Sequence, residues 1–447
     1  MIFFMDGTDI LVIGGGVSGR AAMRLAETLR RPARLVSDGD DEAKQLETVF
    51  SGVGSVVVSP GVTAASRLLQ EALRRRLPVE SELQFGARHF GGRILAVTGT
   101  NGKTTTVELT THLLRACGAP ARYAGNIGVP LSVLAAADLA SGGAPDPERI
   151  AVTEVSSFQL EYTPELGAEA AVLLNLESDH LNRYPGGMAE YREVKERVFR
   201  GVAPENRLYG ISMPEAAGNH ARFAIRRDGL FRGRERMLDL NETALSAPHN
   251  RENLLGALEL AVRGLRREPD LALLAGAIKN FHPGDHRIQL VAEAGGVRYI
   301  DDSKATNPAA VLAALRALSS VPQGNILLLA GGLDKDMDFA ALADGAPWLR
   351  KAFLFGSCRE RIRAALDGKV PLAVFVTLDE AFGAARAAAA PGNTVLLSPA
   401  AASMDQFRDY KERGEKFAAL ARSAGTTARK LAQELRRSDF FAKKTGK

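Results

Sequence analysis

The sequence predicts an α/β protein made of three domains, each with a mainly parallel sheet. Short apolar runs that read as buried strands alternate with longer stretches of helical periodicity over most of the chain. Glycine-containing or polar loops follow several of these strands, as they do in doubly wound folds. With 447 residues, the chain is also longer than one hydrophobic core usually supports.

The composition is that of a globular protein, with 46% apolar and 24% charged residues. The net charge of +5 comes largely from groups such as Arg74–Arg76 and from the tail Arg436–Lys447. No clustered aromatic residues accompany these charges, so solvated helix faces are favoured over a nucleic-acid partner. Cys117 and Cys358 stand far apart, which predicts neither a disulfide framework nor a zinc site. No signal sequence or membrane span is recognised, and we expect a cytoplasmic protein.

The first segment, to residue 92, carries strand-like runs at Ile10–Ile13, Ala33–Val36 and Ser55–Val58. Gly14–Gly19 follows the first run and fits the pattern G-x-G-x-x-G, and Asp38 comes at the end of the next strand. This combination predicts a Rossmann-like unit whose glycine-rich loop binds the phosphates of a nucleotide. The local pattern leaves two ligands open, a nicotinamide dinucleotide and a nucleotide diphosphate.

The second segment begins at Arg93 and contains a partial P-loop. An apolar strand, Arg93–Val97, leads into a loop that ends at Lys103, and helical periodicity follows over Thr104–Ala116. This order directs backbone N–H groups and a helix N-terminus toward one point, where a polyphosphate would be stabilised. Lys103 supplies a positive charge for the outer phosphates, and the hydroxyl of Thr104 can ligate Mg²⁺. Val97 stands where the complete P-loop pattern has its first glycine.

Three other residues of this segment are candidates that each have an ordinary alternative. Glu154 follows the apolar strand Ile150–Val152, where an acid can bind Mg²⁺ or can instead stabilise the N-terminus of a helix. His180 lies in the polar loop after the strand Ala170–Leu174, either as a metal ligand or as a surface histidine. Lys195 lies in a charged helix, and its spacing does not separate it from solvent-exposed neighbours.

The remainder of the chain continues the α/β pattern. Residues 201–247 are rich in arginine and read as a small β-excursion, a helix follows at about Asn253–Leu265, and the pattern breaks at Phe281–Gly284. The expected strands of the third segment are Arg298–Ile300, Asn325–Leu329, Ala352–Phe355 and Thr394–Leu397, and the expected helices are Ala309–Leu318, Phe339–Leu342 and one after Phe407. Polar blocks at Asp302–Asn307 and Ser398–Phe407 follow two of these strands. Polar loops at strand ends in all three segments predict one site closed between domains.

Taken together, the motifs resemble those of the Mur ligases and the related folylpolyglutamate synthetases. The loop Thr98–Thr104 is similar to the ATP loop of that family, in which the first glycine of the P-loop is normally missing. The other blocks that carry the resemblance are Ser59–Gly61, Gly125–Gly128, Ser156–Glu161, Asp302–Asn307, Leu397–Pro399 and Asp405–Phe407. They occur in order over nearly the whole chain and look specifically like those of the members that add D-glutamate.

The resemblance implies a ligase that uses ATP and Mg²⁺ to add D-glutamate to UDP-N-acetylmuramoyl-L-alanine in peptidoglycan precursor synthesis. ATP would phosphorylate the carboxylate of the UDP substrate, and the amine of D-glutamate would attack the resulting acyl phosphate. The implied domains are a Rossmann-like UDP-substrate domain (1–92), a central P-loop-type ATPase domain (93–284) and a Rossmann-like D-glutamate domain (285–447). We expect a monomer with small-molecule substrates, and neither a nucleic-acid partner nor insertion into a membrane.

The resemblance also implies roles for particular residues. Catalytic roles fall to Lys103, Glu154, His180, Lys195 and Lys304. ATP contacts fall to Gly99, Thr100, Asn101, Gly102, Lys103, Thr104, Thr105, Asn253, Arg287, Asp302 and Lys304. Two Mg²⁺ sites would use Thr104, Glu154, His180 and Lys195, with Lys195 modified to a carbamate that turns a cation into an anionic ligand. The UDP substrate would contact Val17, Ser18, Gly61, Asn126 and His180, and D-glutamate would contact Thr306, Lys335, Ser403, Met404 and Tyr410.

Two other classes of function stay open from the sequence. An oxidoreductase that uses the Gly14–Gly19 loop for NAD would have no recognisable hydride-transfer site and would leave the Lys103 loop without a role. A non-catalytic nucleotide-binding switch would leave the polar blocks at Asp302 and Ser398 without one.

Overall fold

The computed structural model describes residues 9–40, 45–142, 144–179, 183–219, 221–318, 321–334 and 337–423. The chain divides into two compact units. One unit comprises Met1–Leu176 with Arg183–Pro283, and the other comprises Glu177–Asn182 with Gly284–Lys447. Within the described residues, the first unit contains two parallel sheets and a small antiparallel one, and the second contains a single sheet.

The first sheet has parallel strands in the order β2-β1-β3-β4. The strands are β1 (Asp9–Ile13), β2 (Ala33–Val36), β3 (Val53–Val58) and β4 (Val79–Ser81). The accompanying helices are α1 (Val17–Thr28), α2 (Leu46–Val49), α3 (Arg67–Arg74) and α4 (Glu82–His89). The strands predicted for this segment are confirmed, and β4 with α4 adds a further unit to the sheet.

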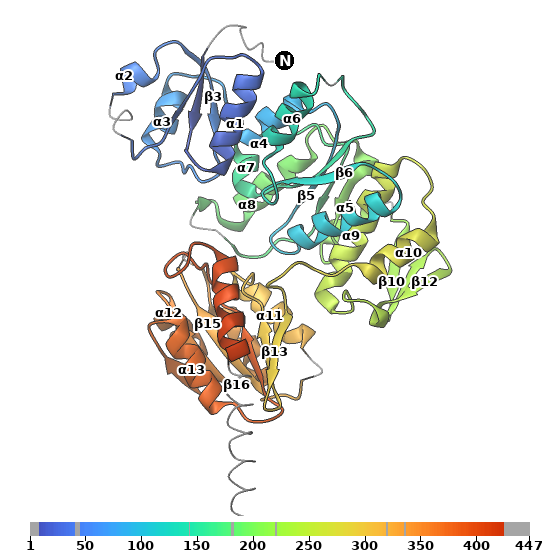
Figure 1. Cartoon of the computed structure of the whole chain (residues 1–447), viewed down its shortest axis with the longest axis vertical. Helices are drawn as coiled ribbons and strands as arrows, with labels where there is room; N and C mark the ends of the chain where they lie inside the picture. Colours follow the sequence, from blue (N-terminus) through green and yellow to red (C-terminus); the bar gives the residue numbers. More distant parts are fainter. Residues whose placement is uncertain are drawn as a thin grey trace, which may run out of the picture. The chain divides into compact units, whose positions relative to one another are not determined.

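Helices cover both faces of this sheet, which explains why β1 and the second half of β3 are continuous apolar runs. Helix α1 lies over one face of the sheet (Figure 1). Leu25 of this helix packs with Val12. Leu68 of α3 packs with Leu11 on the opposite face. Helix α6 (Leu131–Ala140) follows a strand of the next sheet in the sequence, yet it joins the same cluster as α1 and packs against α4. The first two sheets are therefore joined through a shared layer of helices.

The second sheet has parallel strands in the order β6-β7-β5-β8-β9. The strands are β5 (Arg93–Thr98), β6 (Ala121–Gly125), β7 (Ile150–Glu154), β8 (Ala170–Leu173) and β9 (Arg207–Tyr209). The helices are α5 (Lys103–Ala116), α6, α7 (Ser157–Glu161), α8 (Gly187–Glu196), α9 (Pro248–Leu265) and α10 (Leu271–Asn280), with 3₁₀ segments at Arg197–Phe199, Pro204–Asn206, Pro214–Gly218 and Leu240–Glu242. Because β5 lies between β7 and β8, the loops that follow these three strands meet at one edge of the sheet.

The predicted β-excursion within residues 201–247 is confirmed as a small antiparallel sheet. Its strands are β10 (Phe223–Arg226), β11 (Gly229–Arg232) and β12 (Glu235–Asp239), in that order. Phe223, Leu230 and Leu238 of these strands join the hydrophobic core that α5 and α9 form over the second sheet. The helix predicted at Asn253–Leu265 begins earlier, at Pro248, since proline suits the first position of a helix.

The sheet of the second unit has the strand order β13-β14-β18-β15-β16-β17, with β13 antiparallel at one edge and the others parallel. The strands are β13 (Gln289–Ala294), β14 (Val297–Asp301), β15 (Ile326–Gly331), β16 (Leu349–Phe355), β17 (Leu372–Val374) and β18 (Thr394–Leu397). The helices are α11 (Pro308–Ala317), α12 (Arg359–Leu366), α13 (Leu378–Ala388) and a last helix that covers 410–423. One face of the sheet packs on α11 and α12, and the other packs on α13 and the last helix (Figure 1).

One helix predicted for this unit is wrong. The segment that starts at Phe339 leads into a 3₁₀ helix, Ala340–Trp348, and not into an α-helix. Pro347 lies inside this segment and has no N–H to donate to an α-helical ladder. The four predicted strands of this unit and its first and last predicted helices are confirmed.

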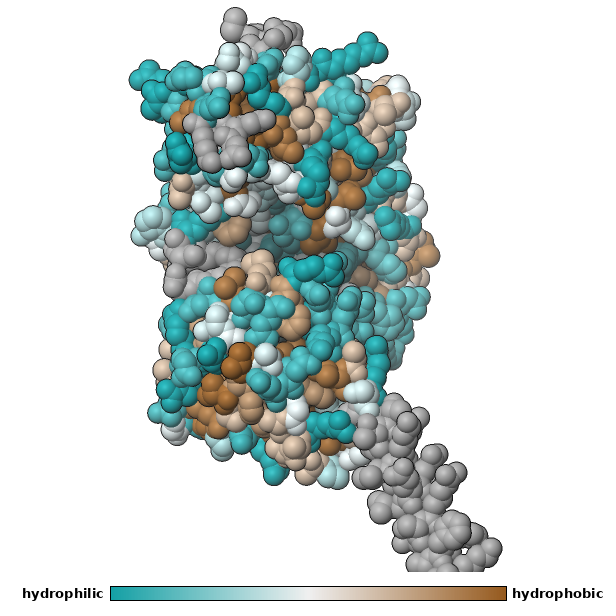
Figure 2. Space-filling model, turned by 60° about the vertical axis from the view of Figure 1, so that its left-hand side comes forward, coloured by the Kyte–Doolittle hydropathy of each residue, from teal (hydrophilic) through white to brown (hydrophobic). Residues whose placement is uncertain are grey.

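The surface is largely hydrophilic where Figure 2 displays it, and apolar side chains there form small separate groups. In the described part of the chain, no helix has the length and apolar character needed to cross a membrane. Two predicted substrate contacts, Val17 and Met404, are exposed apolar residues with 65% and 58% of their surface accessible.

Candidate active site

The partial P-loop has the predicted order of strand, loop and helix. β5 ends at Thr98 and α5 begins at Lys103. Gly99 (φ +148°) and Gly102 (φ +81°) have backbone conformations that residues with a Cβ rarely adopt. A Cβ on Gly102 would also lie 2.0 Å from Oδ1 of Asn253, so the loop passes directly against α9. The structure thus brings Asn253, a predicted ATP contact, to this loop.

Two lysines converge on the carbonyl oxygen of Gly99. Nζ of Lys103 donates a hydrogen bond to it at 2.9 Å and another to the carbonyl of Thr100 at 2.7 Å. Nζ of Lys195, which comes from α8, donates to the Gly99 carbonyl at 2.8 Å. Lys195 is only 1% exposed, and its Nζ lies 4.8 Å from the centre of the Tyr191 ring. The structure therefore brings Lys195 into contact with the loop, although its spacing in a charged helix predicted a solvent-exposed side chain.

Glu154 lies at the carboxyl end of β7, is 1% exposed and is directed at the same loop. Its Oε2 accepts a hydrogen bond of 2.7 Å from Oγ1 of Thr104. Glu154 is not part of the first turn of α7, which begins at Ser157 and whose described residues include no acid. The side chain of Ser156 caps that helix instead, by accepting from the backbone N–H of Gln159. The carboxylate of Glu154 contacts the first turn of α5 through Thr104, so the alternative in which it stabilises a helix N-terminus stays open beside the metal site.

Asn126 is bonded to Glu154 through both its backbone and its side chain. Its Nδ2 donates to Oε1 of Glu154 at 2.8 Å, and its backbone N donates to the carbonyl of Glu154 at 2.9 Å. Sequence reasoning assigned Asn126 to the UDP substrate alone. The structure places it between that predicted site and the partial P-loop of residues 99–102 between β5 and α5, which we call the phosphate loop.

A cavity of about 500 Å³ opens beside the glycine-rich loop that follows β1. Its lining residues are Ile13, Gly14, Gly16, Val17, Ser18, Ser37, Asp38, Ser59, Pro60, Gly61, Val62, Thr63 and Asn126. They include every described residue that was predicted to contact the UDP substrate. Two serines fix the loop. Oγ of Ser37, which sequence reasoning missed, accepts from the N–H of Gly15 at 3.0 Å, and Oγ of Ser59, which belongs to a block that carries the resemblance but was given no role of its own, donates to the carbonyl of Gly14 at 2.9 Å.

Arg183 joins this cavity to the second sheet, and no sequence pattern had singled it out. Its Nη2 donates to the carbonyl of Val62 at 2.9 Å and to Oε2 of Glu161 at 2.7 Å, and its Nε donates to Oε1 of Glu161 at 2.7 Å. Its guanidinium also lies 4.2 Å from the centre of the Phe158 ring. A paired, stacked arginine of this kind holds the cavity wall against α7.

In the second unit, Asp302 and Lys304 follow β14 and meet the other polar block. Oδ2 of Asp302 accepts a hydrogen bond of 2.8 Å from Oγ of Ser398, and burial raises the pKa of Asp302 to about 7. Nζ of Lys304 lies 4.0 Å from the centre of the Tyr410 ring. The structure thus brings Asp302, Lys304 and Tyr410, three predicted site residues, into one region.

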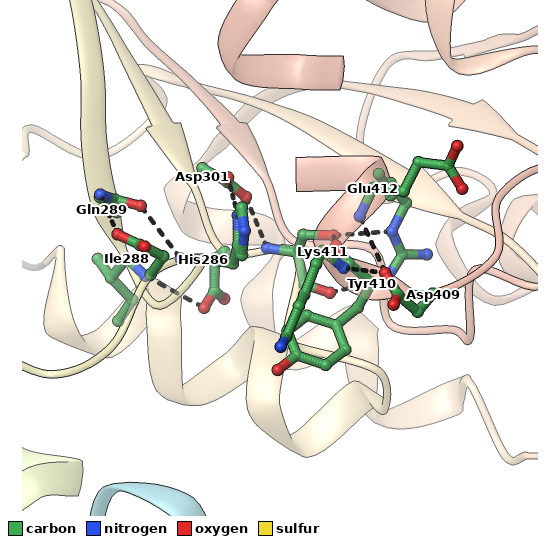
Figure 3. Close-up of polar contacts among 12 residues, drawn as sticks. His286, Ile288, Gln289, Asp301, Asp409, Tyr410, Lys411 and Glu412 are labelled. Atoms are coloured by element: carbon green, nitrogen blue, oxygen red, sulfur yellow. Dashed lines mark hydrogen bonds and ion pairs between the residues drawn. The ribbon is translucent and has the colours of Figure 1, made fainter. Parts of the chain in front are cut away.

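A histidine and an aspartate that sequence reasoning missed pack beside this region. Nδ1 of His286 lies 2.7 Å from Oδ2 of Asp301, and Figure 3 shows the imidazole beside that carboxylate. The ring of His286 meets the ring of Tyr410 edge to face, with 6.2 Å between their centres. A Cβ on Gly414 would lie 2.1 Å from Nδ1 of His286, so the last helix passes tightly over this pair.

Arg413 holds the two polar blocks together from inside the unit. It is 0% exposed and donates to the carbonyl of Ser303 at 2.8 Å, to Oγ of Ser303 at 2.9 Å and to the carbonyl of Ala401 at 3.0 Å. Burial lowers the pKa of Arg413 to about 10, which still leaves the guanidinium charged at neutral pH. Arg413 lies in a charged stretch after Phe407, and nothing in the sequence distinguished it from surface arginines.

The remaining predicted site residues make fewer of the contacts described above, or lie outside the described residues. Thr306 precedes Asn307, the residue that caps α11, and Ser403 is buried at the end of the second polar block. Nε of Arg287 is buried without a hydrogen-bond partner in the described structure. His180 and Lys335 lie outside the described residues. Among the residues that are described, no three His, Cys, Asp or Glu side chains form a group that could hold a metal ion.

The chain matches two family models and many relatives. Residues 97–223 match the Mur ligase middle domain, and residues 286–401 match the Mur ligase glutamate ligase domain. The chain is 36% identical to the UDP-N-acetylmuramoylalanine–D-glutamate ligase of Syntrophus aciditrophicus, with 93% of this chain and 98% of that protein covered. The UDP-N-acetylmuramate–alanine ligase MurC of Thermotoga maritima has a similar fold, with a TM-score of 0.60, 16% identity and coverage of 93% and 100% of the two chains. The MurF ligase of Thermotoga maritima, solved in complex with ADP, gives a TM-score of 0.56 at 15% identity, with 94% and 96% covered.

Proposed function

Because this chain belongs to the Mur ligase family, we propose that it uses ATP to add D-glutamate to UDP-N-acetylmuramoyl-L-alanine. The observation that carries the proposal is the meeting of Lys103, Thr104 and Glu154 at the phosphate loop, next to the cavity that Asn126 lines. The relative from Syntrophus aciditrophicus is named for this activity and is matched over nearly its whole length, which supports the choice of substrates.

We assign residues 1–92 to the UDP substrate, 93–284 to ATP and 285–447 to D-glutamate. The sheets are consistent with this division, because each assigned range contains one parallel or mainly parallel sheet. We also propose that the enzyme works in the cytoplasm as a monomer. Sedimentation of the purified protein at the mass of one chain, 47.7 kDa, would support the monomer, and a larger mass would contradict it.

The phosphates of ATP would bind at the loop between β5 and α5. Lys103 would leave the carbonyls of Gly99 and Thr100, which now accept its hydrogen bonds, and pair with the outer phosphates. The first N–H groups of α5 have no acceptor within the helix and would donate to the same phosphates. Gly99, Asn101, Gly102 and Thr105 complete the loop that we assign to ATP, with Asn253 against it.

The donor set at this loop fits Mg²⁺. Glu154 and Thr104 offer a carboxylate and a hydroxyl oxygen in hydrogen-bond contact, and oxygens are the ligands that Mg²⁺ prefers. Bound there, Mg²⁺ would neutralise phosphate charge during transfer. We assign a second site to His180 and Lys195, for which Lys195 would have to be a carbamate because an ammonium group cannot ligate a cation.

The UDP moiety would occupy the cavity lined by Val17, Ser18 and Gly61, and we prefer it to NAD. The volume of about 500 Å³ suits a ligand of nucleotide size. The loop after β1 would supply backbone N–H groups to the pyrophosphate, as glycine-rich turns do. We assign His180 to the other end of the substrate, near the carboxylate that reacts.

D-Glutamate would bind in the second unit. Its two carboxylates would be recognised by Lys335 and by the hydroxyl and backbone N–H groups around Ser403, with Thr306, Met404 and Tyr410 alongside. Lys304, Asp302 and Arg287 would contact the nucleotide, and the cation–π contact with Tyr410 supports a shared place for Lys304 and the amino acid. Arg413 would keep both polar blocks in register.

The proposed reaction requires no covalent intermediate between the enzyme and its substrates. A carboxylate oxygen of the UDP substrate attacks the γ-phosphorus and ADP departs, which gives an acyl phosphate. The amine of D-glutamate then attacks the acyl carbon, loses a proton, and phosphate leaves as the amide forms. Because both reactants in the first step are anions, positioning and neutralisation of charge by Lys103 and its neighbours would supply most of the rate enhancement.

An assay of phosphate release with single components omitted tests the proposal. We expect phosphate only when UDP-N-acetylmuramoyl-L-alanine, D-glutamate, ATP and Mg²⁺ are all present. Far better turnover with another amino acid, such as meso-diaminopimelate, would contradict the assigned substrate. Tight binding of a nicotinamide dinucleotide in a titration, without phosphate release, would instead favour the oxidoreductase.

A further inference from the structure

The phosphate loop is held from outside by the side chain of Asn175, which follows β8 and has no role in the proposed reaction. Oδ1 of Asn175 accepts a hydrogen bond of 2.8 Å from the backbone N of Asn101. Nδ2 of Asn175 donates to the carbonyl of Asn101 at 3.3 Å. The backbone carbonyl of Asn175 also accepts from the N–H of Thr100 at 3.0 Å. One residue thus engages three backbone groups of the loop.

Glu252, from α9, fixes which way the Asn175 amide faces. Oε2 of Glu252 accepts a hydrogen bond of 2.7 Å from Nδ2 of Asn175. Oε1 of Glu252 is held by Ser212, whose N–H and hydroxyl donate at 3.1 and 2.7 Å. Because an ionised carboxylate can only accept, Nδ2 of Asn175 must face Glu252 and Oδ1 must face the N–H of Asn101.

The position of the Glu252 side chain is restricted by the backbone at Gly210. A Cβ on Gly210 would lie 2.4 Å from Oε1 of Glu252 and 1.9 Å from the carbonyl oxygen of Leu174. The chain therefore approaches Glu252 as closely as glycine allows. A chain of contacts runs from Gly210 and Ser212 through Glu252 and Asn175 to the phosphate loop.

We propose that Asn175, oriented by Glu252, is a positioning residue for nucleotide binding. By holding the peptide groups of Thr100 and Asn101, it sets the loop before the phosphates arrive, and donors that are already in place need no reorganisation on binding. The inference rests on the assignment of this loop to ATP under the proposed function.

The variant N175D tests the inference with almost no change in size. The introduced carboxylate cannot donate, so both bonds from Nδ2 are lost and two acceptors face it, the carbonyl of Asn101 and the carboxylate of Glu252. We expect the affinity for ADP with Mg²⁺ to fall by about 30-fold, and the affinity for the UDP substrate to stay unchanged. Adding E252Q should recover about tenfold, because the new amide can donate to the introduced carboxylate while its oxygen still accepts from Ser212.

Asn219 provides a matched control within the same unit. Its Oδ1 accepts from the backbone N of Tyr209 at 3.0 Å and its Nδ2 donates to the carbonyl of Tyr209 at 2.6 Å, the same pairing that Asn175 makes with Asn101. N219D should therefore lower the melting temperature, but by less than N175D, because Asn175 loses a second bond and its new carboxylate faces Glu252. Its affinity for ADP should remain that of the unmodified protein.

Titration of ADP with Mg²⁺ into the four variants N175D, N175D/E252Q, N219D and K103A gives the answer. Unchanged ADP affinity in N175D, an equal loss in N219D, or no recovery in the double variant would each overturn the inference. The result for K103A shows whether a failure concerns only the inference or also the proposed function. If K103A loses affinity for ADP while N175D keeps it, only the inference about Asn175 fails. If K103A also binds ADP as the unmodified protein does, the loop is not the nucleotide site and both proposals fail together.

Discussion

The hydroxyl of Thr104 donates a hydrogen bond of 2.7 Å to Oε2 of Glu154. Thr104 stands in the first turn of α5, and Glu154 is the last residue of the neighbouring strand β7. Their contact shows that the carboxyl edge of the second sheet brings a strand-end acid onto the phosphate loop. It also gives the Mg²⁺ assignment its clearest test.

We expect E154Q to lower the rate of phosphate release by about 100-fold or more. The amide oxygen can still accept from Thr104, so the loop should keep its shape, but the negative charge that attracts Mg²⁺ is gone. The measurement is the rate of phosphate release against Mg²⁺ concentration. E148Q, which changes an exposed acid on the loop before β7, is the control and should behave normally. An E154Q variant with the usual Mg²⁺ dependence would remove Glu154 from the metal site.

We expect K195A to be nearly inactive, since Lys195 is buried against the carbonyl of Gly99 and is assigned to the second metal site. If the active form is a carbamate, added formate or acetate should partly restore the rate by placing a free carboxylate in the vacated space. K279A, at an exposed lysine that pairs with Glu242, serves as the control for the effect of the added salt. Full activity in K195A without any addition would rule out the carbamate.

Glu82 predicts a pH dependence of stability that is independent of catalysis. Its carboxyl is buried; Oε1 accepts from the N–H of Ser132 at 2.8 Å, whereas Oε2 has no hydrogen-bond partner in the described structure. Burial raises the pKa of Glu82 from 4.5 to about 7. The folded protein therefore keeps a proton that the unfolded chain releases between these two values, and stability falls as pH rises through that window.

The variant E82Q should remove this effect, because an amide resembles the protonated carboxyl at every pH. Near pH 4.5 the variant and the unmodified protein should unfold at similar urea concentrations. At about pH 8 the variant should be more stable, by about 1–3 kcal/mol. Other buried acids, such as Glu80, contribute equally to both proteins, so the difference between the curves is the quantity to measure. Curves that stay parallel over the whole range would contradict the prediction.

Arg413 should be the most costly side chain to remove from the second unit. R413M leaves the carbonyls of Ser303 and Ala401 buried without their donor, and we expect a loss of about 3–5 kcal/mol in the free energy of unfolding. R413K should recover part of the loss, since an ammonium can still donate to one or two of these acceptors. R408M, at an exposed arginine, is the control. Equal stability of the 413 and 408 variants in urea unfolding would show that the two polar blocks hold together without Arg413.

The strands and most helices followed from the sequence because their signal is local. Apolar runs such as Ile10–Ile13 and Arg93–Val97 correspond to β1 and β5, and the periodicity from Thr104 to Ala116 corresponds to α5. The failure at Phe339–Leu342 has the same origin, because Pro347 lies just beyond the segment on which the prediction was made.

The site was predictable only where its residues stand at strand ends. Glu154 and Asp302 could be found that way, whereas Lys195 could not, because its burial against Gly99 depends on how α8 packs. Arg183, Asn175 and Arg413 were missed for a related reason. Each joins segments that are far apart in the chain, and the local spacing of residues in the sequence does not indicate such a contact.

Asn126 lines the cavity assigned to the UDP substrate and at the same time donates its amide to Glu154. This double use has a consequence for inhibitor design. The amide nitrogen of Asn126 has two N–H groups, so a compound in the cavity could accept from one while the other still donates to Glu154. A compound that instead moves this amide out of reach of Glu154 would break the bond between the two residues. Such a compound would lower the affinity for ATP that we propose for the neighbouring loop, although it binds outside the ATP site. ATP at high concentration would therefore not displace it by direct competition.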